Sequence, residues 1–122
     1  MVQLGKARCL YFSAGPDSNI VGATASLLLE VDEAQDVDEE KYLKELRPMA
    51  ASTNATTVMY GTSWTATTLL EKQRANNKRL EAEDGIRRDF TYDWRRVGAF
   101  NEAYRRFVAA EVDRLEIGRA HV

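Results

Sequence analysis

Two adjacent carboxylates, Asp32 and Glu33, are the side chains in this 122-residue sequence whose types and spacing are best suited to chemistry. They follow an apolar run, residues 27–31 (LLLEV), whose Leu and Val content is typical of a buried strand in an α/β sheet. Open α/β sheets bind their ligands at the carboxyl ends of the strands. Neighbouring strand residues point to opposite sides, so the two acids can take different roles.

An apolar strand that ends in Asp-Glu is typical of the Walker B segment of nucleotide hydrolases. In such a segment Asp32 would hold Mg²⁺, directly or through water, and Glu33 would polarise the attacking water. Glu30 lies within the same strand and, by its two-residue period, on the face of Asp32. A buried carboxylate is costly unless it is paired. We therefore expect Glu30 either to face the nucleotide cleft or to have a partner that the sequence does not identify.

The next elements must position these acids. Asp38 can cap a helix that runs to about Arg47, with Leu43 and Leu46 on one face. Pro48 favours a helix end just before it, and a further turn after it is the alternative.

A short strand is predicted at residues 56–60 (TTVMY), and it ends at Gly61 and Thr62. We expect it to be the parallel neighbour of strand 27–31, with the helix as the crossover between them. The fold class predicted from this order is α/β.

The rest of the chain contributes further predicted elements. These are a first strand at Lys6–Ser13, a turn at 14–19, a connector of small residues at 20–26, a polar helix at 67–83, an alternating aromatic strand at Arg88–Trp94, and a final helix capped by Asn101. The basic residues of the polar helix are interpreted as a solvated face, with DNA contact as the alternative. The final helix carries an aromatic stripe, interpreted as core or as a docking surface.

Composition limits the class of protein. The net charge is −2, with residues 1–60 at −4 and residues 61–122 at +2, so charge alone does not predict nucleic-acid binding. Cys9 is the only cysteine, which excludes an internal disulfide and a cysteine-based zinc site. No apolar run approaches the roughly 20 residues that span a bilayer. We expect no membrane association and a cytoplasmic location.

The last six residues, Ile117 to Val122, match the in-frame translation of ATC GGA AGA GCA CAC GTC, part of a widely used short-read sequencing adapter. We interpret residues 117–122 as an adapter-derived tail, with a native tail as the alternative. This interpretation removes His121, the only histidine, from any functional argument.

The ordered set of motifs resembles the large subunit of tailed-phage DNA-packaging terminases. Four pieces carry the resemblance: residues 21–25 (VGATA), residues 29–36 (LEVDEAQD), residues 58–64 (VMYGTSW), and residues 90–94 (FTYDW) followed by the helix at 104–115. Together they cover most of residues 20–115.

The resemblance implies that residues 1–116 are the C-terminal part of an ATPase domain with a partial RecA-like P-loop core. It implies that Asp32 serves Mg²⁺, that Glu33 is the catalytic base for ATP hydrolysis, and that Gly61 with Thr62 couples the nucleotide state to movement of DNA. The implied partners are double-stranded DNA, a portal protein, a small terminase subunit and further copies in a homo-oligomeric ring, in the cytoplasm of an infected bacterium.

The sequence departs from the family in three respects, one of which is that Glu30 makes the strand more polar than is usual in the family. No Gly-x-x-x-x-Gly-Lys-Ser/Thr segment occurs, although the family carries this phosphate-binding loop upstream of Walker B. The family's nuclease domain would lie downstream of Glu116. The resemblance therefore implies an internal fragment that does not hydrolyse ATP by itself.

Two alternatives stay open. Residues 32–36 (DEAQD) also resemble motif II of superfamily 1 DNA helicases, although the helicase strand usually ends in Gly-Asp and Gln where this chain has Gly61 and Thr62. The other alternative is a non-enzymatic α/β interaction domain in which Asp32 and Glu33 simply end a strand.

Overall fold

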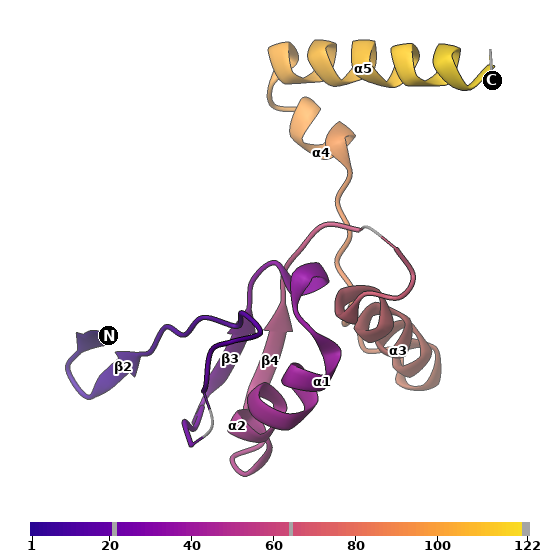
Figure 1. The fold of residues 1–122 in the computed structure, drawn as a ribbon. Coiled ribbons are helices and arrows are strands. Elements are labelled where there is room, and N and C mark those ends of the chain that lie inside the picture. The colour runs from indigo at the N-terminus through magenta and orange to yellow at the C-terminus, as the bar shows by residue number, and fades with distance from the viewer. Residues whose placement is uncertain (21, 64, 121–122) are drawn as a thin grey trace. The chain divides into compact units, whose positions relative to one another are not determined.

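The computed structural model describes residues 1–20, 22–63 and 65–120, and of residues 116–120 the backbone alone. Val21 and Trp64, which belong to the pieces that resemble terminases, and His121 lie outside the described residues. The chain divides into two compact units, Met1–Ile86 and Arg87–Val122 (Figure 1).

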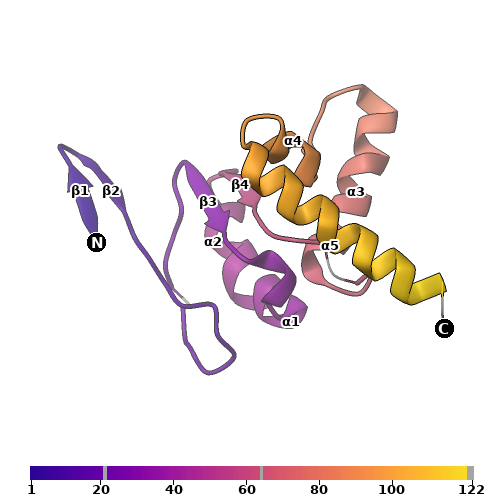
Figure 2. The same cartoon turned by 90° about the horizontal axis from the view of Figure 1, so that it is seen from above.

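The first unit is built on a small parallel sheet of two strands. Strand β3 (Leu28–Val31) pairs with β4 (Thr56–Met59) in the register Leu28↔Thr56 to Val31↔Met59, and the two strands run side by side in both ribbon views (Figures 1 and 2). The predicted parallel pair is confirmed, although each strand is one residue shorter than expected. Together with the surrounding helices, this sheet gives the unit a mixed α/β architecture.

The connection between the two strands is a helical turn followed, after the extended residues Val37 and Asp38, by a longer helical segment. It consists of the 3-10 turn η1 (Ala34–Asp36), helix α1 (Glu39–Lys41), the π-helical turn η2 (Tyr42–Leu46) and helix α2 (Arg47–Ala51). The predicted cap is confirmed, because Asp38 Oδ2 accepts a hydrogen bond of 3.1 Å from the Lys41 N–H.

The π-helical turn corrects two details of the prediction. The helix continues past Pro48, which lies in the first turn of α2, directly after the π-helical turn. The wide turn, in which the Arg47 N–H bonds the Tyr42 carbonyl, also changes the side-chain spacing. Tyr42 and Leu46 are buried, whereas Leu43, which we expected to share the face of Leu46, is exposed.

The core of the first unit lies where this helical segment covers the sheet. In β3 the side chains alternate, so Leu29 and Val31 are buried while Leu28 and Glu30 are exposed. The buried apolar residues are Ile20, Leu29, Val31, Ala34, Tyr42, Leu46, Met49, Ala50 and Leu69.

Lys41 is the buried charged residue of this unit, and it connects the helical segment to the preceding turn. Its Nζ donates to the Ser18 carbonyl and, at 2.6 Å, to Glu45 Oε2. The predicted turn itself is confirmed by a hydrogen bond of 3.1 Å from the Ser18 N–H to the Gly15 carbonyl. Paired in this way, the Lys41 charge can be buried.

Helix α3 (Leu69–Asp84) confirms the predicted polar helix within two residues at each end. Thr68 caps it, with its Oγ1 accepting a hydrogen bond of 3.2 Å from the Glu71 N–H, and Gly85 ends it at a φ of 73°. Among its basic residues Arg79 pairs with Glu83 at 2.9 Å, as expected for a solvated face.

The amino-terminal segment differs from the prediction. An antiparallel hairpin forms from β1 (Val2–Leu4) and β2 (Ala7–Cys9), with Gly5 at a φ of 60° in its turn. The predicted strand Lys6–Ser13 is therefore wrong in extent, and β1 was not predicted. Every residue of the hairpin is exposed, Cys9 included, so its pairing comes from the turn and not from burial.

The second unit consists of helix α4 (Trp94–Gly98) and helix α5 (Glu102–Ala120). The predicted strand Arg88–Trp94 is wrong, because the described residues of this unit offer no strand to pair with it. Asp93 instead caps α4, its Oδ1 accepting a hydrogen bond of 2.9 Å from the Arg95 N–H. The predicted cap of α5 is confirmed, with Asn101 Oδ1 accepting at 3.0 Å from the Tyr104 N–H.

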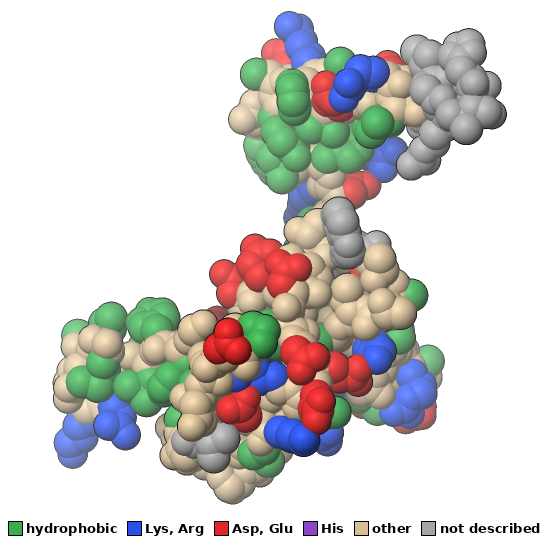
Figure 3. Space-filling view, in the orientation of Figure 1, with side chains coloured by type: hydrophobic (Ala, Val, Ile, Leu, Met, Phe, Trp, Pro, Cys, Tyr) green, Lys and Arg blue, Asp and Glu red, His purple; other side chains and the backbone are tan. Residues whose placement is uncertain are grey.

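The aromatic stripe of the second unit is exposed. Phe100 is 88% exposed and Phe107 66%, and Figure 3 shows apolar side chains gathered on the face of this unit that is in view. Within the unit, Gly98 is the buried contact between the two helices, because a Cβ there would lie 3.0 Å from the Arg105 Cβ.

Candidate functional site

The loops that follow β3 and β4 lie at the same end of the sheet, because the two strands are parallel. The Tyr60 N–H donates to the Val31 carbonyl at 2.9 Å, and the Ala34 N–H donates to the Tyr60 carbonyl at 2.8 Å. These backbone bonds extend the pairing of the strands into the loops. The structure therefore brings together the two predicted segments, Asp32-Glu33 and Gly61-Thr62.

The two adjacent acids have different surroundings, as expected for neighbouring residues after a strand. Asp32 Oδ1 accepts a hydrogen bond of 2.9 Å from the Glu33 N–H, and Asp32 Oδ2 has no hydrogen-bond partner among the described residues. Glu33 has a left-handed backbone (φ 49°, ψ 46°), which costs an L-residue roughly 1–2 kcal/mol. Both side chains are exposed at the end of the sheet.

Gln35 lies between the acids and the Gly-Thr segment. Its Nε2 donates to Glu33 Oε2 at 2.5 Å, and its Oε1 accepts from the Thr62 N–H at 3.2 Å. Gln35 was not predicted as a site residue. Its position in a tight turn that begins at the fully buried Ala34 is what directs it towards the neighbouring strand.

Gly61 lies close against the loop that follows β3. A Cβ at this position would lie 2.1 Å from Gln35 Oε1, 2.9 Å from Leu70 Cδ2 and 3.3 Å from the Ala34 backbone nitrogen. Because Leu70 and the Ala34 backbone would also be in the way, a larger residue cannot be accommodated by moving Gln35 alone. Glycine is required here for space and not for its backbone freedom.

Glu30 has a partner, which the sequence analysis left open. The Tyr60 hydroxyl donates to Glu30 Oε1 at 3.0 Å across the parallel strands. This hydrogen bond is the largest cause that raises the pKa of Tyr60, and the negative charges of Glu30 and Asp32 add to it. Glu30 is exposed, so it avoids the cost of a buried carboxylate.

A shallow cavity of about 480 Å³ adjoins the two acids, and acidic side chains gather over the loop after β3 in Figure 3. It is lined by Ala14, Gly15, Pro16, Asp32, Glu33, Asp36, Val37 and Asp38. Mg²⁺ is usually held by one or two carboxylates together with waters and phosphates, so Asp32 is a suitable donor. No group of three or more Asp, Glu, His or Cys side chains that could hold a metal ion occurs among the described residues.

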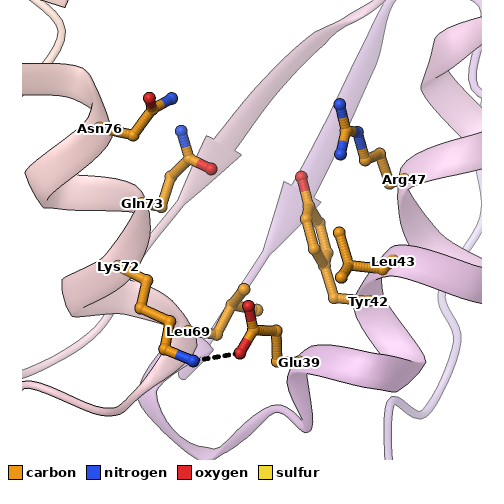
Figure 4. A pocket seen from close by; sticks show the side chains of 8 residues that line it. All are labelled: Glu39, Tyr42, Leu43, Arg47, Leu69, Lys72, Gln73 and Asn76. Carbon is orange, nitrogen blue, oxygen red and sulfur yellow. Dashed lines mark hydrogen bonds and ion pairs between the residues drawn. The ribbon is translucent and has the colours of Figure 1, made fainter. Parts of the chain in front are cut away.

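A second cavity, of about 350 Å³, lies between the crossover helix and α3 (Figure 4). Lys72 and Glu39 form an ion pair at one side of it, and Arg47 and Tyr42 lie at the other. Burial raises the pKa of Tyr42, although the nearby Arg47 opposes this shift. No residue predicted to carry chemistry lines this cavity, so the candidate site is the end of the sheet.

No family model, curated protein or solved structure matches the chain. None of the helices in the described part of the chain is both long enough and apolar enough to cross a membrane. Function is therefore inferred from the residues and geometry at the end of the sheet.

Proposed function

We propose that residues 1–116 belong to the ATPase domain of a tailed-phage terminase large subunit, the ATP-driven motor that packages viral DNA into proheads. In this proposal β3 and β4 are neighbouring strands of a RecA-like core. The observation that carries it is the meeting of Asp32-Glu33 with Gly61-Thr62 at the carboxyl ends of two parallel strands. Open α/β sheets bind ligands at that end.

Each residue then has a distinct role. Asp32 would hold Mg²⁺ through Oδ2, which has no hydrogen-bond partner among the described residues, and the ion would neutralise charge on the phosphates of ATP. Glu33 orients the attacking water and accepts its proton, and the left-handed backbone together with Gln35 fixes the direction of its carboxylate. Thr62 carries an exposed hydroxyl beside this site and responds to the presence of the terminal phosphate.

Residues outside the cavity must bind the phosphates, because no Lys or Arg is among the side chains that line it. We therefore expect the chain by itself not to hydrolyse ATP. In the parent protein the phosphate-binding loop precedes this segment, a nuclease domain follows it, and residues 117–122 are not native. The partners of the parent are double-stranded DNA, the portal protein, the small terminase subunit and further copies in a ring, in the cytoplasm of the infected host.

The test uses the full reading frame, recovered from the flanking DNA. Glu33→Gln should lower the rate of ATP hydrolysis by about 10²–10⁴-fold while ATP binding persists, because the amide keeps the shape but cannot act as a base. Asp32→Asn should also weaken Mg²⁺-dependent nucleotide binding, because it removes a charge beside the ion. Thr62→Val should retain part of the hydrolysis but lose DNA packaging.

ATP hydrolysis and DNA translocation are measured on the same three variants. A Glu33→Gln enzyme that hydrolyses ATP at the wild-type rate contradicts the proposal. An upstream phosphate-binding loop excludes the non-enzymatic interaction domain, and a downstream RNase H-like acidic domain selects terminase over helicase.

A further inference from the structure

We propose that Gln35 is a positioning residue that links the Glu33 carboxylate to the backbone at Gly61 and Thr62. The inference rests on the proposed function for its meaning, since the two ends of the link are the proposed base and the proposed coupling segment. Its geometry is independent of that function. It consists of a donor bond of 2.5 Å to Glu33 and an acceptor bond of 3.2 Å from the Thr62 N–H.

The chemistry of the partners fixes the orientation of the Gln35 amide. An ionised Glu33 carboxylate can only accept a hydrogen bond, and the Thr62 N–H can only donate one. Only one placement of the amide nitrogen and oxygen satisfies both partners, so the alternative flip is excluded by the network. Among the ordinary side chains of this length, glutamine alone offers a donor and an acceptor on one rigid planar group.

The Gln35 amide is also held by steric contact with Gly61, in addition to its hydrogen bonds. A Cβ on Gly61 would lie 2.1 Å from Gln35 Oε1, so the amide already touches this backbone. On the other side Gln35 belongs to the turn η1, whose first residue, Ala34, is fully buried. The amide is therefore held between two backbones, and a displacement at Glu33 has a short path to Thr62.

The consequence is a coupling between the two ends. When the Glu33 carboxylate turns to water or nucleotide, the Gln35 Nε2 loses its partner and the amide reorients. The Thr62 N–H then loses its acceptor, and its segment changes its hydrogen bonding. The coupling is reciprocal: a change at Thr62 shifts the conformational equilibrium of the Glu33 carboxylate by the same coupling free energy.

The test is made on the whole chain by amide NMR and hydrogen exchange at Thr62. Gln35→Met keeps the length but removes both bonds, so the Thr62 N–H should exchange about five- to tenfold faster, as expected for one lost hydrogen bond. Gln35→Glu keeps an acceptor for Thr62 but cannot donate to Glu33, so it separates the two halves of the link. If Gln35→Met fails to fold, Gln35→Glu carries the test.

Transmission is tested by adding Glu33→Met to each background, because this substitution keeps the length of the side chain but removes the acceptor for Gln35 Nε2. In the otherwise wild-type chain it should shift the Thr62 amide resonance, and in Gln35→Glu or Gln35→Met the shift should disappear. Asp36→Asn is the matched control: it removes a charge from the same loop, it replaces neither of the two hydrogen-bond partners of the Gln35 amide, and it should leave Thr62 unchanged in every background. Thr62→Val should keep the link, because the acceptor bond uses the backbone N–H.

The link is overturned if the Thr62 N–H of the wild-type chain exchanges without protection, or if its response to Glu33→Met survives the loss of Gln35. These results are distinguishable from failure of the proposed function. If the NMR test confirms the link but the parent Glu33→Gln enzyme hydrolyses ATP normally, the structural coupling stands and the terminase assignment is contradicted. If the parent enzyme needs Glu33 for hydrolysis but the Thr62 amide does not respond to substitution of Gln35, only this inference is contradicted.

Discussion

Two stretches of this chain have the pattern of a strand, and only one of them forms a strand. Residues 28–31 form β3, which is paired along its whole length with β4. Residues 88–94 alternate more strictly, yet they lie outside any strand. In β3 the residues Leu29 and Val31 are buried, whereas Phe90 is 58% exposed and Tyr92 62%.

The difference shows that side-chain pattern is only half of what a strand needs. Backbone N–H and C=O groups require partners, and in the first unit a short crossover helix returns the chain to a parallel neighbour. In the second unit the aromatic rings make local contacts with cations, with the Arg87 guanidinium 4.6 Å from the Phe90 ring centre and that of Arg96 5.4 Å from the ring of Tyr92. Those contacts satisfy side chains but give the backbone no partner.

The largest expected effect contrasts one residue from each stretch. Val31→Asp places a carboxylate in the core and should destabilise the first unit by more than about 3 kcal/mol, because a buried charge without a partner is strongly unfavourable. Tyr92→Asp changes an exposed side chain and should stay within about 0.5 kcal/mol. Urea unfolding followed by NMR resonances of each unit measures both. Equal losses would show that the two stretches are not different in kind.

The same contrast explains how much the sequence could predict. The parallel pair, the caps at Asp38 and Asn101 and the helix at 69–84 depend on local signals and on one crossover, so they were predictable. The π-helical turn was not predicted, because the spacing of Leu43 and Leu46 fits an ordinary α-helix. β1 was missed because its pairing depends on a turn at Gly5 and not on a buried face.

At the site, the sequence predicted which strand ends meet but not what joins them. Asp32 and Glu33 follow one strand and Gly61 and Thr62 the next, and parallel pairing places both pairs at one edge. The role of Gln35 could not be predicted, because its direction is set by a 3-10 turn whose first residue is buried. A steric test for glycine at position 61 likewise needs three-dimensional neighbours.

A smaller effect is expected where the loops of the paired region approach each other. Gly61→Ala should cost about 1–3 kcal/mol, because its Cβ would collide with Gln35, Leu70 and the backbone of Ala34. Gly15→Ala is the control, because its Cβ would lie 3.4 Å from Ser13 Oγ, an ordinary contact. Thermal unfolding of both variants tests whether the strand ends are as tightly closed as the geometry indicates.

Capping residues provide a matched pair of milder changes, one in each unit. Thr68→Ala should cost the first unit about 1 kcal/mol, because the cap starts a helix whose Leu69 is in the core. Asp93→Ala removes the cap of the five-residue helix α4 and should fray that helix. Hydrogen exchange in each helix measures the two results. Unchanged protection in the first turn of α3 or of α4 would contradict the role of its cap.

The smallest expected effect is electrostatic and belongs to the paired stretch alone. The pKa of the Tyr60 hydroxyl is raised chiefly because it donates a hydrogen bond to the Glu30 carboxylate across β3 and β4. A pKa raised by folding gives a stabilisation that is complete below the pKa of unfolded tyrosine, about 10, and is lost as the pH rises through the higher folded value. Glu30→Gln should therefore lower the Tyr60 titration midpoint, followed by ring NMR from pH 8 upward, and salt should weaken the wild-type shift because the pair is exposed. An unchanged midpoint in Glu30→Gln would mean that the hydroxyl does not hold Glu30, and that the pairing of the strand ends stops at the backbone.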